Sequence, residues 1–262
     1  MDKAIDPGIL RKFSEILEKK AKHVKYDFQE LGLMLAKKLG EWNRRSFYMR
    51  LAKLEDRRLV MQAFMYAADA PINKRAGLFL WKLTQLKEQT HYRAFVGVFF
   101  DKEKNTQLLE VYNQIKGVKL VPFENLHYTL AFWGRLKGVD YPKVVDAVSK
   151  LRAKYNFPVE ITWAQLDTVE NKYLWLLKAS ASAYRLFYGF RKILVQKKLN
   201  HLVKQMPQKP KPHITLARLK KGETKEVKIP ELKKPVVTYG NVYFVISRLT
   251  PKGPIYKRHE YY

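Results

Sequence analysis

The sequence contains no cysteine and no long apolar run. The absence of cysteine from all 262 residues excludes disulfides, thiol nucleophiles and zinc sites built on cysteine. The longest apolar stretch, near Phe95 to Phe100, is far shorter than the ~20 residues that a membrane span needs. The first residues, Met1 to Pro7, lack the apolar segment of a signal peptide. In a chain with 47% hydrophobic residues, these absences predict a soluble, cytoplasmic globular protein without membrane association.

Acidic residues are scarce relative to basic ones. The chain has 51 Lys and Arg against 24 Asp and Glu, which gives a net charge of +27. Residues 1–90 contribute +8 of this charge and the remainder +19, with basic residues dense between Arg191 and Lys234. An excess of this size favours an anionic partner, above all nucleic acid. The alternative is a generally basic surface that serves no particular ligand.

A short pattern occurs twice in the second part of the chain. His127-Tyr-Thr-Leu130 returns 86 residues later as His213-Ile-Thr-Leu216. Because alternate side chains of a strand point to opposite faces, the histidine and threonine of each copy share one face. The apolar residues between them take the other face, which suits a buried side. Each copy therefore presents one imidazole beside one hydroxyl.

Two such pairs facing each other form a chemically competent phosphodiester site without a metal. One neutral imidazole takes a proton from the attacking group, and the other, protonated, gives one to the leaving oxygen. The hydroxyls of Thr129 and Thr215 donate hydrogen bonds to the non-bridging phosphate oxygens. No carboxylate recurs at a fixed offset from His127 and His213, so a zinc site is not expected. No cofactor is expected either.

The segments around both motifs resemble a known family. They are similar to the 2H phosphoesterases, specifically the RNA 2′,3′-cyclic phosphodiesterases, also called 2′-5′ RNA ligases. The resemblance covers roughly residues 92 to 258 and rests on four segments in the family's order. These are Arg93–Val98, Asn125–Gly134 with Trp133 where an aliphatic residue is usual, His213–Arg218, and Ser247–Tyr256.

The resemblance implies a substrate and a role for each site residue. The substrate is an RNA end or short oligonucleotide with a 2′,3′-cyclic phosphate, which water opens to leave a 2′-phosphate. His213 is assigned as the base and His127 as the acid, while Thr129 and Thr215 hold the phosphate. Two further substrate contacts follow from the family's pattern, namely Arg218 and, for stacking on a base, Tyr256. The last two residues have an alternative interpretation as an ion-pair partner and a core residue.

Residues 1 to about 90 read as a helical accessory domain, which the resembled family lacks. Apolar residues recur at helical spacing around 9–17, 28–39, 42–68 and 78–86. The third range has a break near Glu55-Asp56, and the fourth follows a break at Pro71. Such helices pack as a small bundle. Arginine pairs beside Trp42 and Phe47 permit contact with RNA. Solvated helix faces, docking and oligomerisation are the alternatives.

From residue 91 onward, helix and strand patterns alternate. Strands are expected at 94–100, 119–121, 157–166, 173–179, 236–239 and 242–248, and helices at 106–116, 139–155 and 183–203. This alternation indicates an α+β or α/β chain. The resemblance implies more: an α+β phosphoesterase domain over 91–262, with two pseudo-symmetric lobes. Each lobe would hold an antiparallel sheet flanked by helices, with the motifs lining a central cleft.

Two other functions stay open from the sequence. The first is a related phosphodiesterase acting on 2′-5′ oligoadenylate, a cyclic nucleotide or a cyclic ADP-ribose phosphate. The second is a protein that binds RNA ends without turnover. Two complete motifs speak against the second, because a pure binder needs no matched acid and base.

Overall fold

The computed structural model describes residues 26–170, 172–219, 230–251 and 253–259. The helix expected around 9–17 lies outside these residues. The chain divides into two compact units, one ending at Leu86 and the other beginning at Lys87. Within the described ranges, no helix is both long enough and apolar enough to cross a membrane.

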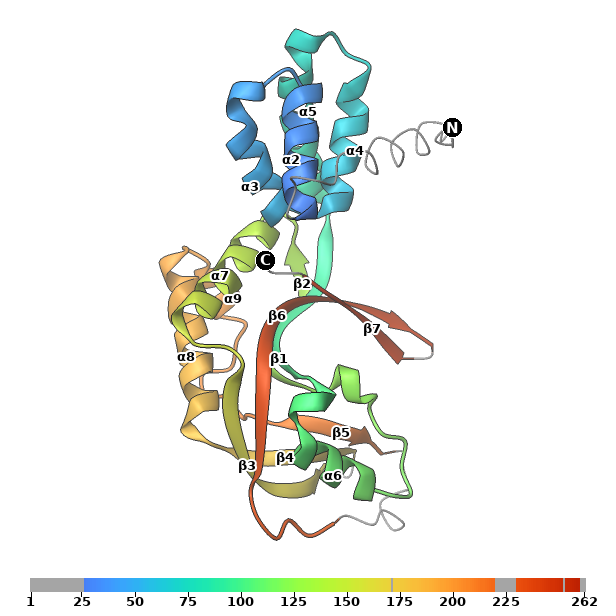
Figure 1. Cartoon of the computed structure of the whole chain (residues 1–262), viewed down its shortest axis with the longest axis vertical. Coiled ribbons are helices and arrows are strands. Elements are labelled where there is room, and N and C mark those ends of the chain that lie inside the picture. The colour runs from blue at the N-terminus through green and yellow to red at the C-terminus, as the bar shows by residue number, and fades with distance from the viewer. Residues whose placement is uncertain (1–25, 171, 220–229, 252, 260–262) are drawn as a thin grey trace. The chain divides into compact units, whose positions relative to one another are not determined.

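The first unit is built of helices (Figure 1). They are α2 (Asp27–Lys38), the 3-10 turn η1 (Trp42–Arg44), α3 (Arg45–Leu54), α4 (Arg57–Ala68) and α5 (Ile72–Gln89), which runs past the boundary. The break predicted at Glu55-Asp56 is confirmed, because α3 ends at Leu54 and Asp56 caps α4 by accepting a hydrogen bond from the Arg58 N–H at 2.9 Å. Helix α5 begins at Ile72, inside the break predicted after Pro71.

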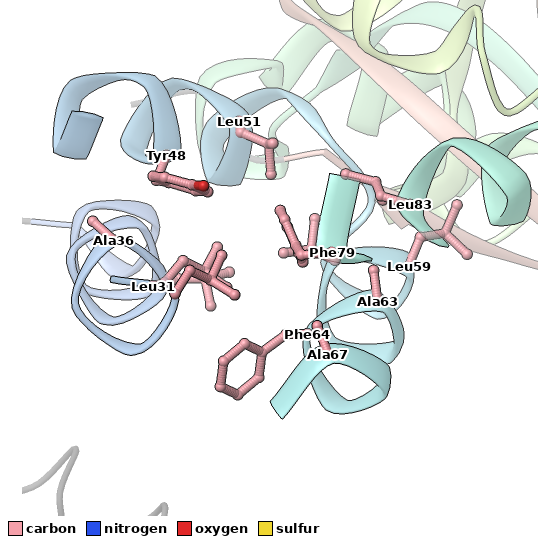
Figure 2. Packing of buried hydrophobic residues seen from close by; sticks show 13 residues of the cluster. Leu31, Ala36, Tyr48, Leu51, Leu59, Ala63, Phe64, Ala67, Phe79 and Leu83 are labelled. Carbon is pink, nitrogen blue, oxygen red and sulfur yellow. The ribbon is translucent and has the colours of Figure 1, made fainter. Parts of the chain in front are cut away.

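One apolar cluster holds these helices together (Figure 2). Each helix contributes the residues that recur on one of its faces, as the spacing predicts. The phenol of Tyr48 is buried in this cluster and donates a hydrogen bond to the Glu41 carboxylate at 2.5 Å. The cluster contains Leu31, Leu35, Ala36, Leu39, Tyr48, Leu51, Leu59, Val60, Ala63, Phe64, Ala67, Phe79 and Leu83.

The second unit contains one seven-stranded sheet with helices, so the α+β prediction is confirmed. The sheet order is β1-β2-β5-β4-β3-β6-β7, every pairing is antiparallel, and an additional pairing joins β1 to β6. The strands are β1 (His91–Phe100), β2 (His127–Lys137), β3 (Val159–Val169), β4 (Tyr173–Ala179), β5 (Ile214–Arg218), β6 (Val236–Thr250) and β7 (Gly253–Arg258).

Strand β6 differs from its prediction. The sequence predicted two strands separated near Gly240, whereas β6 is one strand whose first part pairs with β3 and whose second part pairs with β1. Gly240 is not a turn. A Cβ at this position would lie 2.4 Å from the Val98 side chain, so the glycine permits the close approach of β1. Figure 1 shows β6 running along the length of this unit.

The prediction of one continuous helix over residues 183–203 is wrong, because the structure has two helices there. Helix α8 (Ala181–Gln196) ends before Lys198, which has a φ of +59°, and the short α9 (Asn200–Val203) follows. The other elements are α6 (Thr106–Gln114), α7 (Tyr141–Lys154) and the turns η2 (Lys102–Lys104) and η3 (Phe123–Asn125). Strand β3 extends to Val169, beyond its predicted end at residue 166, and segment 119–121 forms only an isolated bridge to β5.

Helix α8 determines which face of the sheet is free near the two motifs. The Tyr128 hydroxyl donates a hydrogen bond to the carbonyl oxygen of Ala183 in α8 at 3.2 Å. Leu126, Tyr128, Leu130, Ile214 and Leu216 are all buried, as the alternation predicted. Side chains that alternate with these residues therefore project from the face away from α8.

Candidate active site

The two motifs lie on neighbouring antiparallel strands. Tyr128 of β2 pairs with Ile214 of β5, and both side chains are buried. In this register His127 lies across from Thr215, and Thr129 lies across from His213. Directly opposite residues of an antiparallel pair have Cα atoms about 4.5–5.5 Å apart and share a face. The structure therefore brings the four predicted residues together, with each imidazole next to the hydroxyl of the other motif.

The main chain orients both imidazoles in the same way. Nδ1 of His127 lies 2.7 Å from the carbonyl oxygen of Asn125, and Nδ1 of His213 lies 2.8 Å from that of Lys211. In each motif the acceptor is two residues upstream of the histidine. Because a carbonyl oxygen only accepts, each Nδ1 carries the hydrogen and donates it. Nε2 of each ring is left to exchange a proton with a bound substrate.

His127 is enclosed by aromatic rings from β1 and β7. Its ring centroid lies 4.8 Å from that of Phe95 and 5.1 Å from that of Phe99, and the latter pair is stacked at 21°. Tyr256 meets it edge-on at 5.6 Å. These contacts remove water from around the imidazole and fix its plane.

This enclosure changes the protonation of His127. Burial lowers the pKa of His127 to about 4, because a low-polarity environment disfavours the charged ring. The hydrogen bond to Asn125 opposes the effect, while the nearby His213, which disfavours a second charged ring, and the positive charges of Arg258 and Arg218 lower the pKa further. His127 is therefore neutral at pH 7 when no anion is bound.

His213 is held by a different aromatic contact. Its ring stacks on Trp175 of β4, with centroids 3.8 Å apart and planes at 16°. Burial lowers the pKa of His213, and the hydrogen bond to the Lys211 carbonyl opposes this. Both imidazoles are thus neutral in the resting protein, and both become better proton acceptors once a negative charge binds beside them.

Arg218 and Tyr256 lie close to the histidine pair. Arg218 is the exposed last residue of β5, and its charge lowers the pKa of both His127 and Tyr256. Tyr256 packs edge-on against Phe95 at 5.1 Å as well as against His127. Burial raises the pKa of the Tyr256 phenol, so this ring is neutral. Its observed contacts are those of a packing residue that helps to fix His127.

The sequence did not single out Arg258, Phe95 or Phe99 as site residues. The Arg258 guanidinium lies 4.1 Å from the Phe99 ring centroid, and it donates a hydrogen bond to the main-chain carbonyl of Glu124, just upstream of His127. Pairing of β7 with β6, and of β6 with β1, brings these residues to one face. The sequence did contain one signal for these residues: Phe95, Gly97 and Phe99 alternate along the predicted strand and so share one of its faces.

Gly97 provides room for the first histidine. It pairs with Thr129 across β1 and β2. A Cβ at this position would lie 3.2 Å from the carbonyl oxygen of Tyr128 and 3.4 Å from Cδ2 of His127. A side chain here would therefore press on the main chain next to the imidazole, so glycine permits the close approach of β1 to His127.

Metal ligands do not gather here within the described part of the chain. No group of three or more His, Cys, Asp or Glu side chains suited to a metal ion occurs among those residues. The groups that converge on this face are imidazole, hydroxyl, guanidinium and aromatic side chains.

The chain is similar to curated archaeal proteins. It is 29% identical over 183 residues to the RNA 2′,3′-cyclic phosphodiesterase of Archaeoglobus fulgidus, covering 63% of this chain and 96% of that protein. It is 28% identical over 155 residues to the protein of the same name from Methanocaldococcus jannaschii, covering 55% of this chain and 83% of that protein. Among solved structures, TT0787 of Thermus thermophilus is 29% identical, with a TM-score of 0.48, covering 64% of this chain and 95% of that one.

No family model matches the sequence. The similarity nevertheless spans nearly the full length of the Archaeoglobus protein, and both complete His-x-Thr motifs are present in this chain. The chain is therefore similar to proteins that bear the name RNA 2′,3′-cyclic phosphodiesterase, and it carries both motifs by which it resembles the 2H phosphoesterases.

Proposed function

We propose that this protein is an RNA 2′,3′-cyclic phosphodiesterase that converts a terminal cyclic phosphate to a 2′-phosphate. The observation that carries the proposal is the register of β2 and β5, which sets two imidazoles and two hydroxyls on one face. The names of the two archaeal relatives support the substrate class. The net charge of +27 supports a polyanionic substrate.

In the proposed mechanism, water attacks the phosphorus atom opposite O3′. Nε2 of His213 takes a proton from the water as its oxygen forms the new P–O bond. The P–O3′ bond breaks, and Nε2 of His127 gives its proton to the departing oxygen. Thr129 and Thr215 donate hydrogen bonds to the non-bridging oxygens, and Arg218 offsets their charge. The proton that His213 gains returns to His127 through solvent before the next turnover.

The protonation states restrict when this can occur. His213 is neutral in the resting protein, as a base must be. His127, with a pKa of about 4, lacks the proton that an acid needs. The negative charge of a bound phosphate raises the pKa of an adjacent imidazole. We propose that substrate binding brings the proton to His127, so the acid forms only in the complex.

The same groups catalyse joining of RNA ends through a 2′-5′ linkage. A 5′-hydroxyl end takes the place of water, and His213 removes its proton as the oxygen attacks the cyclic phosphate. His127 again protonates the departing O3′. By microscopic reversibility, cleavage of the linkage begins when His127 takes a proton from the 3′-hydroxyl and ends when His213 protonates the departing 5′-oxygen. Ligation therefore needs no additional catalytic residue.

We also propose that residues 1–90 form an accessory domain that contacts RNA. Trp42 and Phe47 are 50% and 40% exposed. Guanidinium groups lie over both rings, that of Arg45 5.8 Å from the Trp42 centroid and that of Arg44 4.8 Å from the Phe47 centroid. Exposed aromatic rings beside cations suit stacking with unpaired bases. Replacing both rings with alanine should weaken binding of long RNA ends more than of dinucleotides.

The decisive experiment uses an RNA oligonucleotide ending in a 2′,3′-cyclic phosphate, incubated with the protein in excess chelator. We expect a 2′-phosphate product at full rate. His127→Ala and His213→Ala should each reduce the rate by roughly 10²–10⁴-fold. Turnover that survives the double substitution, or that requires an added divalent metal, would contradict the two-histidine mechanism. Turnover of 2′-5′ oligoadenylate or a cyclic nucleotide instead would redirect the substrate assignment.

A further inference from the structure

Trp175 lies on the same face of the sheet as the two motifs. It pairs with Thr215 across β4 and β5, and directly opposite residues of antiparallel strands share a face. Its indole stacks on His213 at 3.8 Å. On the same strand, Tyr173 stacks on Trp175 with centroids 5.5 Å apart and planes at 23°. Trp175 is thus placed between a packing residue and an imidazole of the site.

The indole nitrogen of Trp175 differs from the other buried ones. Nε1 of Trp133 donates to the carbonyl oxygen of Leu202 at 3.2 Å, and Nε1 of Trp163 donates to the Thr238 hydroxyl at 2.9 Å. Nε1 of Trp175 is buried and has no hydrogen-bond partner among the residues that the structure describes. An indole N–H only donates, and leaving it buried without an acceptor is unfavourable, because the group has lost its hydrogen bond to water.

Such an orphaned donor at a binding face indicates an acceptor that arrives with the ligand. Thr215, whose hydroxyl we have assigned to the phosphate, lies directly across the sheet from Trp175. A phosphate presents several acceptor oxygens and carries negative charge, which strengthens a hydrogen bond from N–H.

We propose that Trp175 is a substrate-binding residue whose indole N–H donates a hydrogen bond to a non-bridging phosphate oxygen. The proposal rests on the proposed function for its choice of a phosphate ligand. The residue has two separable parts. Its ring holds His213 by stacking, and its N–H binds the phosphate, so one substitution can remove the second while retaining the first.

The matched variant is Trp175→Phe, which keeps a flat ring beside His213 and lacks the N–H. We expect kcat/KM for a cyclic-phosphate substrate to fall roughly 10- to 100-fold, the loss expected for one hydrogen bond to a charged group. Affinity for the 2′-phosphate product should fall in parallel. The pH profile should keep its shape, because His213 keeps its stacking partner. A purely structural role predicts unchanged affinity for the product.

A direct measurement follows the indole N–H signals by NMR in the wild-type protein. The Trp175 signal is identified by its loss in Trp175→Phe. We expect it to move and to exchange more slowly with solvent when inorganic phosphate or a nucleoside 2′-monophosphate is added. The signals of Trp133 and Trp163 provide internal controls, since their N–H groups are already bonded within the protein.

The outcomes separate this proposal from the proposed function. No response of the Trp175 signal to either phosphate would mean that its N–H binds water only, which overturns the proposal. A response to the nucleotide but not to inorganic phosphate would place the acceptor on the nucleoside and also overturn it. A response to inorganic phosphate in a protein that does not hydrolyse the cyclic RNA end would support the phosphate contact while refuting the substrate.

Discussion

The protonation of His127 provides the strongest test of the site's electrostatics. Lowering its pKa from 6.5 to about 4 means that the free protein at pH 6.5 carries the proton on roughly one molecule in 300, since each pKa unit is a factor of ten. The same difference corresponds to about 3 kcal/mol, at 1.36 kcal/mol for each pKa unit. We therefore expect the ring to titrate near pH 4 and not near 6.5.

The sign of the effect on stability follows from the same values. The unfolded chain binds a proton at His127 before the folded protein does, because the folded pKa is the lower one. This contribution to the free energy of unfolding is fully present above pH 6.5 and is lost progressively as the pH falls from 6.5 toward 4. Below about pH 4 both states are protonated, and no further loss occurs.

The assay is a pH titration of the histidine ring signals by NMR, from pH 7.5 to 3.5. His127→Phe assigns the His127 signal and keeps a flat ring beside Phe95 and Phe99. A nucleoside 2′-monophosphate should shift the midpoint upward, because the bound anion stabilises the imidazolium ion. A midpoint at or above 6.5 in the free protein would refute the argument that burial controls this site.

Four further substitutions test individual contacts. Thr129→Val and Thr215→Val should each lower kcat/KM by roughly 10- to 150-fold, the value of a hydrogen bond to a charged phosphate, and steady-state kinetics on the cyclic substrate measures this. Arg258→Gln removes a positive charge that lowers the pKa of His127, so the NMR midpoint of His127 should rise. Gly97→Ala places a methyl group 3.2 Å from the carbonyl oxygen of Tyr128, next to His127, and should reduce kcat, with a smaller effect on thermal stability.

Each of these changes has a control or an opposing result. Unchanged kinetics in both valine variants would show that the two hydroxyls do not bind the phosphate. A His127 midpoint that stays the same or falls in Arg258→Gln would contradict the assigned charge effect. For Gly97→Ala the matched control is Gly134→Ala, on β2, where the added methyl meets only Phe132 at 3.9 Å. Equal loss of kcat in the two variants would show that the damage is not local to His127.

Much of the site was predictable because strand alternation is a local property. The sequence correctly assigned Tyr128 and Ile214 to a buried face, and so assigned the histidines and threonines to the other. It contains no local signal for the pairing of Tyr128 with Ile214. Register between strands far apart in the sequence depends on the folded sheet as a whole.

The errors also have physical causes. Gly240 resembles a turn residue in sequence, yet it serves the contact between β6 and β1, which only the folded sheet reveals. The apolar pattern of α8 continues into α9 because Leu199 and Leu202 are buried too, so periodicity alone does not show the break at Lys198. Arg258 reaches the site through pairings of β7, β6 and β1, a sequence of contacts that no local pattern encodes.

The hydrogen bonds that orient the two imidazoles have an evolutionary consequence. Both acceptors are main-chain carbonyl oxygens, at Asn125 and Lys211, and not carboxylate side chains. A carbonyl oxygen persists whatever side chain its residue bears, so point mutations at these two positions do not delete the acceptor. The orientation of the two rings is thereby encoded in the path of the backbone, and a substitution at position 125 or 211 leaves the acceptor in place.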